Sequence, residues 1–281
     1  MLDAHTIQIQ RRALLEAEKL YAKPEFMASD PVELVHAYTD PLDQEVAALL
    51  CALFAYGNVK AMRGFLSALL SRMKTPSSIL SKNFDPARIA GKLYYRFQST
   101  RDLRIILEGV SKIFRRVHKR AAGLESIFEG PTLRERISSF QKEFAHNVTL
   151  TRGVLHWIGS PESTGAQKRF CMFLRWMTRT TFPDFGLYKT FHPRDLIVPL
   201  DVHMARMAQN LNWTTAAGAG WKNAVEITRS LATIEPEDPL RFDFVITRPG
   251  ILGVCRSILK PACDHCPVRR PCKVYGQKIL A

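Results

Sequence analysis

The sequence lacks any continuous apolar segment near the roughly 18 residues that a membrane-spanning helix needs. Its opening segment, MLDAHTIQIQRRALLEAEKL, alternates charged and apolar residues and has no apolar centre of the kind found in secretory signal peptides. These two absences predict a soluble, cytoplasmic protein that makes no contact with a membrane.

Alternating strand patterns, internal repeats and low-complexity linkers are also missing. Apolar residues instead recur at helical spacing, and the segment 42–56 is apolar nearly all round, as in a central buried helix. Thr132 and Glu135 have the spacing of a capping box, which predicts a helix start. We therefore expect an all-α fold with its main helices over 42–56, 103–117, 133–144, 166–179, 202–211 and 221–232.

Acidic residues are scarce: 26 Asp and Glu stand against 40 Lys and Arg, giving a formal net charge of +14. A field of this sign attracts polyanions, and nucleic acid is the polyanion that a soluble protein most often meets. Solubility is the competing explanation, although negative charge would serve it equally well. One basic stripe at helical spacing fits either a phosphate-binding face or a solvated one: Lys112, Arg115, Arg116, Lys119 and Arg120.

Four of the six cysteines are concentrated near the C-terminus with the spacing C-x7-C-x2-C-x5-C. In a reducing compartment such a group indicates a shared metal centre rather than disulfides. Zinc accepts four thiolates, as does a four-iron four-sulfur cluster. A single CxxC with two outlying cysteines favours the cluster, and zinc is the alternative. The predicted ligands are Cys255, Cys263, Cys266 and Cys272.

The remaining cysteines and the histidine of this loop have simpler interpretations. Cys51 and Cys171 fall in apolar helical segments, which favours the core for both. His265 lies inside the CxxC and is expected to face solvent. Basic residues are threaded through the loop, and we expect them to contact DNA phosphates, a solvated basic tail being the alternative: Arg256, Lys260, Arg269 and Arg270.

The segment 198–211 reads VPLDVHMARMAQNL. It resembles the V-D-T-H-x-x-R-V segment of helix-hairpin-helix DNA glycosylases of the endonuclease III group, in which C-x6-C-x2-C-x5-C follows. This chain has the same order of motifs, with one extra residue in the first cysteine gap. The resemblance implies a two-lobed helical fold. Residues 31–184 would form a barrel-like domain with the hairpin, and residues 1–30 and 185–281 a second domain carrying the cluster.

The resemblance also implies a catalytic pair. The family's lysine nucleophile matches Lys168, and its aspartate matches Asp201. The usual L-P-G-V-G-x-K hairpin is absent, only Gly165 stands near the lysine, and the interval to the aspartate is long. In both of these features the chain resembles archaeal 8-oxoguanine glycosylases more than endonuclease III. The patterns K-R-x-x-x-F-L-R-W-M and P-L-D-x-H also resemble a largely uncharacterised bacterial family related to these enzymes.

A lysine amine can attack deoxyribose C1′ once the damaged base has left the stack, and β-elimination can then nick the strand. Asp201 would stabilise the developing positive charge or move a proton. The plainer interpretations are an N-cap for Asp201 and a surface lysine for Lys168.

Further DNA contacts are expected from the hairpin and from a loop between two early helices. Thr164 and Gly165 would offer backbone N–H groups to a phosphate, and Tyr56 or Asn58 would fill the space of the flipped nucleotide. The implied partner is duplex DNA containing a damaged base, bound by a nucleoid-associated monomer. 8-Oxoguanine is the first candidate lesion. The alternatives are another lesion, a non-catalytic iron–sulfur or zinc DNA-binding protein, or a zinc-stabilised RNA-binding protein.

Overall fold

The computed structural model describes the backbone of residues 3–280 and the side chains of residues 3–276. The described residues are helical, with no strand and only two isolated bridges, Tyr95–Gln98 and Gly165–Gly220. This confirms the expected all-α class. None of the described helices is both long and apolar enough to cross a membrane.

The chain divides into two compact units, one formed by residues 30–163 and the other by residues 1–29 and 164–281. We call them the middle unit and the terminal unit. The middle unit contains the helices α2 (Val32–Val35), α3 (Pro41–Leu53), α4 (Val59–Met73), α5 (Pro86–Ala90), α6 (Thr100–Lys119), α7 (Leu133–His146) and α8 (Arg152–Ile158), with short 3-10 turns at Pro76–Leu80 and Leu124–Ile127.

Helix α3 is the centre of the middle unit, as its apolar sequence predicts. Every residue from Val46 to Phe54 is fully buried. Thr132 and Glu135 form the predicted capping box at the start of α7, and Ser99 with Asp102 forms another at the start of α6. Gly109 lets α6 approach Phe144 of α7, because a Cβ at this glycine would lie 2.8 Å from the ring.

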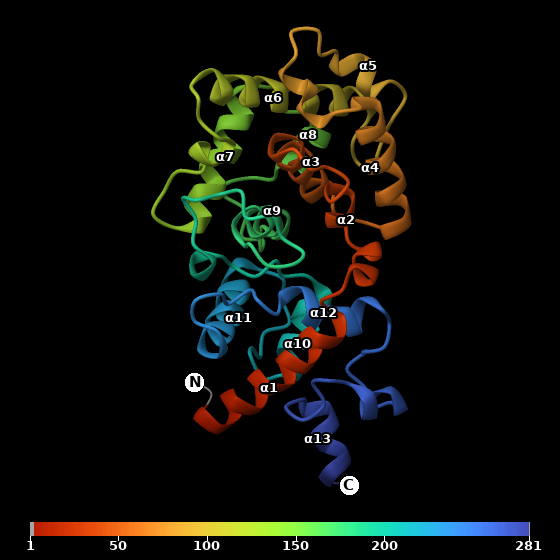
Figure 1. Ribbon diagram of the computed structural model, residues 1–281, viewed down its shortest axis with the longest axis vertical. Helices are drawn as coiled ribbons and strands as arrows, with labels where there is room; N and C mark the ends of the chain where they lie inside the picture. The colour runs from red at the N-terminus through yellow and green to blue at the C-terminus, as the bar shows by residue number, and fades with distance from the viewer. Residues whose placement is uncertain (1–2, 281) are drawn as a thin grey trace. The chain divides into compact units, whose positions relative to one another are not determined.

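The terminal unit contains α1 (Ala4–Tyr21), α9 (Lys168–Thr178), α10 (Val202–Asn210), α11 (Trp221–Ile234), α12 (Asp243–Ile251) and α13 (Lys273–Leu280), with 3-10 turns at Pro24–Ser29, Pro193–Asp195 and Pro261–His265. Helix α1 packs on α11 and α12, and α12 also packs on α10 (Figure 1). Buried Gln10 joins α1 to the segment after α10, since it donates to the Leu211 carbonyl at 2.8 Å and accepts from the Trp213 indole at 2.8 Å.

The second boundary between the units differs from the expected one at 184/185, because residues 164–184 cluster with the terminal unit. Charged contacts explain the difference. Arg175 of α9 and Arg179, which directly follows this helix, both pair with Asp184. Arg175 also pairs with Asp243, and Arg179 with Asp238, much later in the chain. Helix α9 is thereby tied to the C-terminal part of the protein.

Candidate functional site

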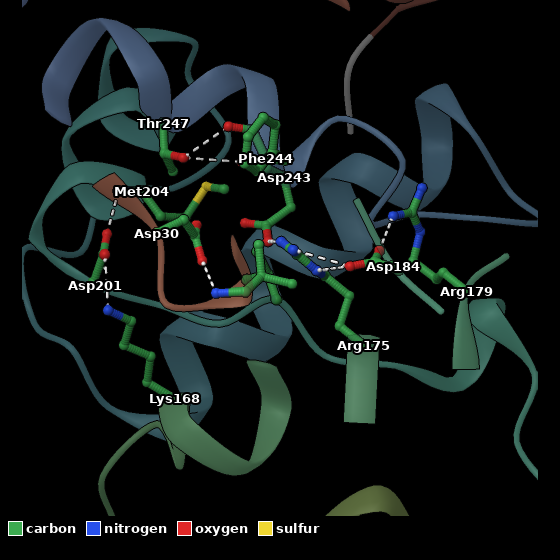
Figure 2. Close-up of polar contacts among 12 residues, drawn as sticks. Asp30, Lys168, Arg175, Arg179, Asp184, Asp201, Met204, Asp243, Phe244 and Thr247 are labelled. Atoms are coloured by element: carbon green, nitrogen blue, oxygen red, sulfur yellow. Dashed lines mark hydrogen bonds and ion pairs between the residues drawn. The ribbon is translucent and has the colours of Figure 1, made fainter. Parts of the chain in front are cut away.

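Lys168 and Asp201 lie side by side within the terminal unit. Lys168 is the first residue of α9, and Asp201 immediately precedes α10. The Lys168 Nζ atom is 3.0 Å from Asp201 Oδ2, and the two side chains are 35% and 23% exposed (Figure 2). The pair is therefore both in contact and accessible to solvent or a ligand.

The two oxygens of the Asp201 carboxylate have different partners. Oδ1 caps α10 by accepting from the backbone N–H groups of His203 and Met204, each at 2.9 Å, whereas Oδ2 faces Lys168. Burial alone would raise the pKa of Asp201, but Lys168 and the Met204 N–H outweigh it and hold this pKa below its ordinary value. Asp201 is thus an N-cap that keeps one ionised oxygen for the amine.

The position of Lys168 follows from the chain just before it. Gln167 adopts a left-handed conformation with φ 51°, and α9 begins at the next residue. The preceding segment is held against the chain before α11, since Ala166 N–H donates to the Ala219 carbonyl at 3.2 Å and Trp221 N–H donates to the Thr164 carbonyl at 3.0 Å. These backbone contacts fix where the amine of Lys168 can reach.

His203 is a site residue that the sequence analysis did not assign. Its Nδ1 atom is buried and has no hydrogen-bond partner among the described residues. The ring lies against Gly250 of α12, where a Cβ would be 2.8 Å from Nδ1. Burial lowers the pKa of His203 below its ordinary value, and the opposing attraction of Asp201 does not offset this effect. The imidazole beside the pair is therefore harder to protonate than a solvent-exposed one.

A buried ion network lies further along α9. Arg175 donates to Asp184 Oδ1 at 3.1 and 3.2 Å and pairs with Asp243, and Arg179 also pairs with Asp184 (Figure 2). Arg179 further contacts both carboxylate oxygens of Asp238 at 2.9 Å. Burial raises the pKa of Asp184, and the attraction of the two arginines opposes that rise. This network is not predictable from local sequence, because nothing near α9 reveals its acidic partners at positions 238 and 243.

The segment expected to form the hairpin is held by backbone contacts within the terminal unit. The carbonyl of Thr164 accepts from Trp221, and Gly165 forms an isolated bridge with Gly220. Thr164 is exposed and Gly165 half-buried.

Tyr56 and Asn58 belong to the middle unit, whereas Lys168 and Asp201 belong to the terminal unit. The Tyr56 hydroxyl donates to Gln98 Oε1. Asn58 is exposed, and its side chain caps α4 by accepting from the Ala61 N–H at 3.2 Å. Each of these residues thus has a local structural role.

Three residues of the basic stripe on α6 make internal contacts. Lys112 pairs with Glu108, Arg116 pairs with Glu143, and Arg115 donates to the carbonyl of Ile79 at 3.1 Å. This part of the stripe is used largely to hold α6 in the middle unit, which weakens its interpretation as a phosphate-binding face.

All four cysteines of the C-terminal loop line one small cavity, together with residues such as Asn210 and Val268: Cys255, Cys263, Cys266 and Cys272. The pKa of the Cys266 thiol is raised to about 11, mainly by burial and in part by the three neighbouring cysteines. No three His, Cys, Asp or Glu side chains in the described part of the chain are placed to hold a single metal ion.

The cysteine loop is anchored to α10, the helix that Asp201 caps. Arg206 donates to the Cys255 carbonyl at 3.2 Å, and the Asn210 amide approaches Cys255 Sγ at 3.7 Å. His265 is exposed, and Cys51 and Cys171 are fully buried in α3 and α9, as expected. Among the predicted DNA contacts of the loop, Arg256 and Arg270 are exposed, whereas Lys260 and Arg269 are half-buried.

Comparisons with known proteins give a family but no activity. Residues 30–252 match the model of a family described as "Protein of unknown function (DUF2400)". The matched region contains Lys168 and Asp201 and ends before Cys255. No curated protein and no solved structure matches the chain. The chain therefore belongs to the DUF2400 family, whose function is unknown.

Proposed function

We propose that this protein is a DNA glycosylase with AP-lyase activity that removes an oxidised base from duplex DNA in base-excision repair. The observation that carries the proposal is the 3.0 Å contact between Lys168 Nζ and Asp201 Oδ2 at the starts of two helices. An amine beside an ionised carboxylate supplies a nucleophile and a proton acceptor at one point. 8-Oxoguanine is the first substrate to test, and the protein acts as a nucleoid-associated monomer in the cytoplasm.

The proposed reaction uses two side chains of the protein, Lys168 and Asp201. Asp201 takes a proton from the Lys168 ammonium, and the neutral amine attacks deoxyribose C1′. The bond from C1′ to the base breaks, and the base leaves with the electron pair and takes the proton that Asp201 holds. The C1′–O4′ bond then breaks as a proton passes from Nζ to O4′, which opens the sugar ring and leaves a Schiff base between Nζ and C1′. Loss of a proton from C2′ then expels the 3′ phosphate, and water releases Lys168.

The helix-hairpin-helix fold with an iron–sulfur loop is part of the same proposal. The four cysteines around one cavity support a four-iron four-sulfur cluster, because each iron takes one thiolate and no three described side chains are placed to share a single ion. Zinc would need all four sulfurs within about 2.3 Å of one point. When bound, the cluster supplies a rigid crosslink of the loop. The chain's own Arg206 and Asn210 connect that loop to α10.

A non-catalytic DNA-binding protein is the second candidate. The observation that favours it is the absence of the L-P-G-V-G-x-K hairpin, since only Gly165 stands near Lys168. Both candidates use the net charge of +14 for binding DNA. They differ in whether Lys168 becomes covalently attached to the sugar.

Borohydride trapping on a panel of lesion-bearing duplexes tests the proposal, because borohydride reduces the Schiff base to a stable crosslink. We expect the wild-type protein to be trapped on at least one oxidised base. Lys168→Gln should abolish trapping, and Asp201→Asn should reduce it by about 10²-fold or more. Lys222→Gln removes an exposed lysine of α11 and serves as the matched control.

The outcomes separate the candidates. Trapping that persists in Lys168→Gln would show that another amine is the nucleophile. Binding of duplexes without processing of any lesion would favour the non-catalytic protein. Trapping on oxidised pyrimidines alone would keep the enzyme class and change the substrate.

A further inference from the structure

The face of α1 that points away from the core forms one wall of a wide groove. The cysteine loop around residues 267–270 forms the other wall. The groove has a volume of about 830 Å³, and both walls belong to the terminal unit. Neither Lys168 nor Asp201 lines it. It is therefore a separate feature from the amine–carboxylate pair.

The groove is strongly basic. Arg12 and Lys19 line it from α1, and Arg269 and Arg270 line it from the loop. Its one carboxylate, Glu16, is already paired with Lys19 at 3.1 Å. The three arginines have no ion-pair partner among the described residues. Three uncompensated guanidinium groups thus share one concave surface.

The charged residues on the neighbouring face of α1, unlike the groove arginines, have ion-pair partners. Arg11, next to Arg12, pairs with Glu235 at 3.3 Å, and Glu18 pairs with Arg241 at 2.9 Å. The neighbouring face of α1 is thus neutralised by α11 and the chain that follows it. Only the groove face retains an excess of positive charge.

The length of the groove along α1 follows from the spacing of the residues that line it. His5, Gln8, Arg12, Glu16 and Lys19 recur every three or four residues along one stripe of α1. At a rise of 1.5 Å per residue, the stripe is roughly 21 Å long. A groove of this length can contact several successive phosphates of one strand. Arginine binds phosphate through two parallel hydrogen bonds, which a groove with arginines on both walls can offer to a strand.

We propose that this groove binds the phosphodiester backbone of nucleic acid, as a second contact surface besides the Lys168–Asp201 pair. The choice of nucleic acid as partner rests on the proposed function and on the net charge of +14. An acidic peptide is the competing ligand. Apolar Ile9 and Leu20, the latter 42% exposed, offer surface to the sugars between the phosphates.

The test measures affinity for undamaged DNA by fluorescence anisotropy at several salt concentrations. The variant Arg12→Ala/Arg269→Ala/Arg270→Ala removes the free charges of the groove. The control Lys23→Ala/Lys222→Ala/Arg229→Ala removes three exposed charges elsewhere in the terminal unit. Each protein is measured with a duplex, with a single strand of the same sequence and with a short polyglutamate peptide. Circular dichroism melting verifies that both variants fold.

We expect the groove variant to bind DNA at least about tenfold more weakly than the control. Its salt slope should fall by about 2–3, since each lost phosphate contact removes about 0.9. A greater loss for the duplex than for the single strand, or the reverse, identifies the form that the groove holds. Equal affinity and slope in both variants would overturn the proposal, as would a groove variant that loses only peptide binding.

The experiment separates this proposal from the proposed function. At saturating protein, the groove variant should still be trapped on a lesion-bearing duplex, since neither Lys168 nor Asp201 lines the groove. If trapping fails on every lesion while the groove variant still loses affinity for DNA, the glycosylase proposal is wrong and the proposal for the groove is supported. Normal trapping together with unchanged affinity in the groove variant gives the opposite conclusion.

Discussion

Arg175 of α9 and Asp243 at the start of α12 form an ion pair whose side chains are only 5% and 6% exposed. Arg175 lies two turns after Lys168, and α12 packs against α10, which Asp201 caps. The pair therefore connects the helix that carries the amine to the helix that supports the carboxylate.

Asp243→Asn should destabilise the protein strongly. Removing one partner of a buried pair leaves the other charge unmatched, which costs about 3–5 kcal/mol; Asp184 still faces Arg175, so we expect the lower end. Urea denaturation measures the change in unfolding free energy. Arg194→Ala, which breaks the exposed pair with Glu237, is the control and should change it by less than about 0.5 kcal/mol. Equal effects of the two substitutions would contradict the structural role of the network.

Gly250→Ala should disturb His203 and the neighbouring pair. The new Cβ would lie 2.8 Å from His203 Nδ1, and overpacking of this kind costs about 1–3 kcal/mol. We expect lower stability and slower trapping. Gly64→Ala, also within a helix but with no atom within 4 Å of the new Cβ, should leave trapping unchanged and raise stability by about 0.5–1 kcal/mol. If Gly250→Ala changed neither stability nor trapping, His203 would have to move aside freely.

Protonation of Asp102 should make the stability of the middle unit depend on pH. Burial would raise its pKa, but hydrogen bonds from Thr151 and Ser99 outweigh this and hold the pKa below its ordinary value. A depressed pKa stabilises the fold above the unfolded pKa, and this stabilisation is lost as pH falls through the folded value. Asp102→Asn should therefore cost about 1 kcal/mol at neutral pH and progressively less below about pH 4. Urea melts over this range measure the difference, and a constant difference would argue against an ionised Asp102.

The loop cysteines should carry iron and acid-labile sulfide. Purified protein should be yellow-brown, and Cys266→Ser should lose most of both elements together with stability in α10, which Arg206 and Asn210 connect to Cys255. Cys51→Ala alters a buried thiol of the middle unit and should retain the full content. Colourless protein containing zinc would rule out the cluster.

Much of the fold could be predicted from local patterns in the sequence. The Thr132–Glu135 capping box and the apolar segment around Val46 depend on neighbours in the sequence, and both predictions are confirmed. Helices α1, α4 and α12 were not among the predicted segments, since their apolar positions are less regular or are interrupted by residues such as Pro249.

Long-range relationships explain what the sequence could not reveal. Nothing around Arg175 or Arg179 indicates that Asp238 and Asp243 neutralise them, so the expected domain boundary fell after α9 rather than before it. The proximity of Lys168 and Asp201 came from a family resemblance, because spacing along the chain alone does not bring them together. His203 was visible in the motif, but its role depends on Gly250, which only the fold places beside it.

The most direct measurement is mass spectrometry of the borohydride-reduced protein–DNA complex, with the crosslinked peptide sequenced. The account predicts a single modified residue, Lys168, on a duplex carrying an oxidised base, and no crosslink in Lys168→Gln. A crosslink to any other lysine, or none on any lesion, would contradict it.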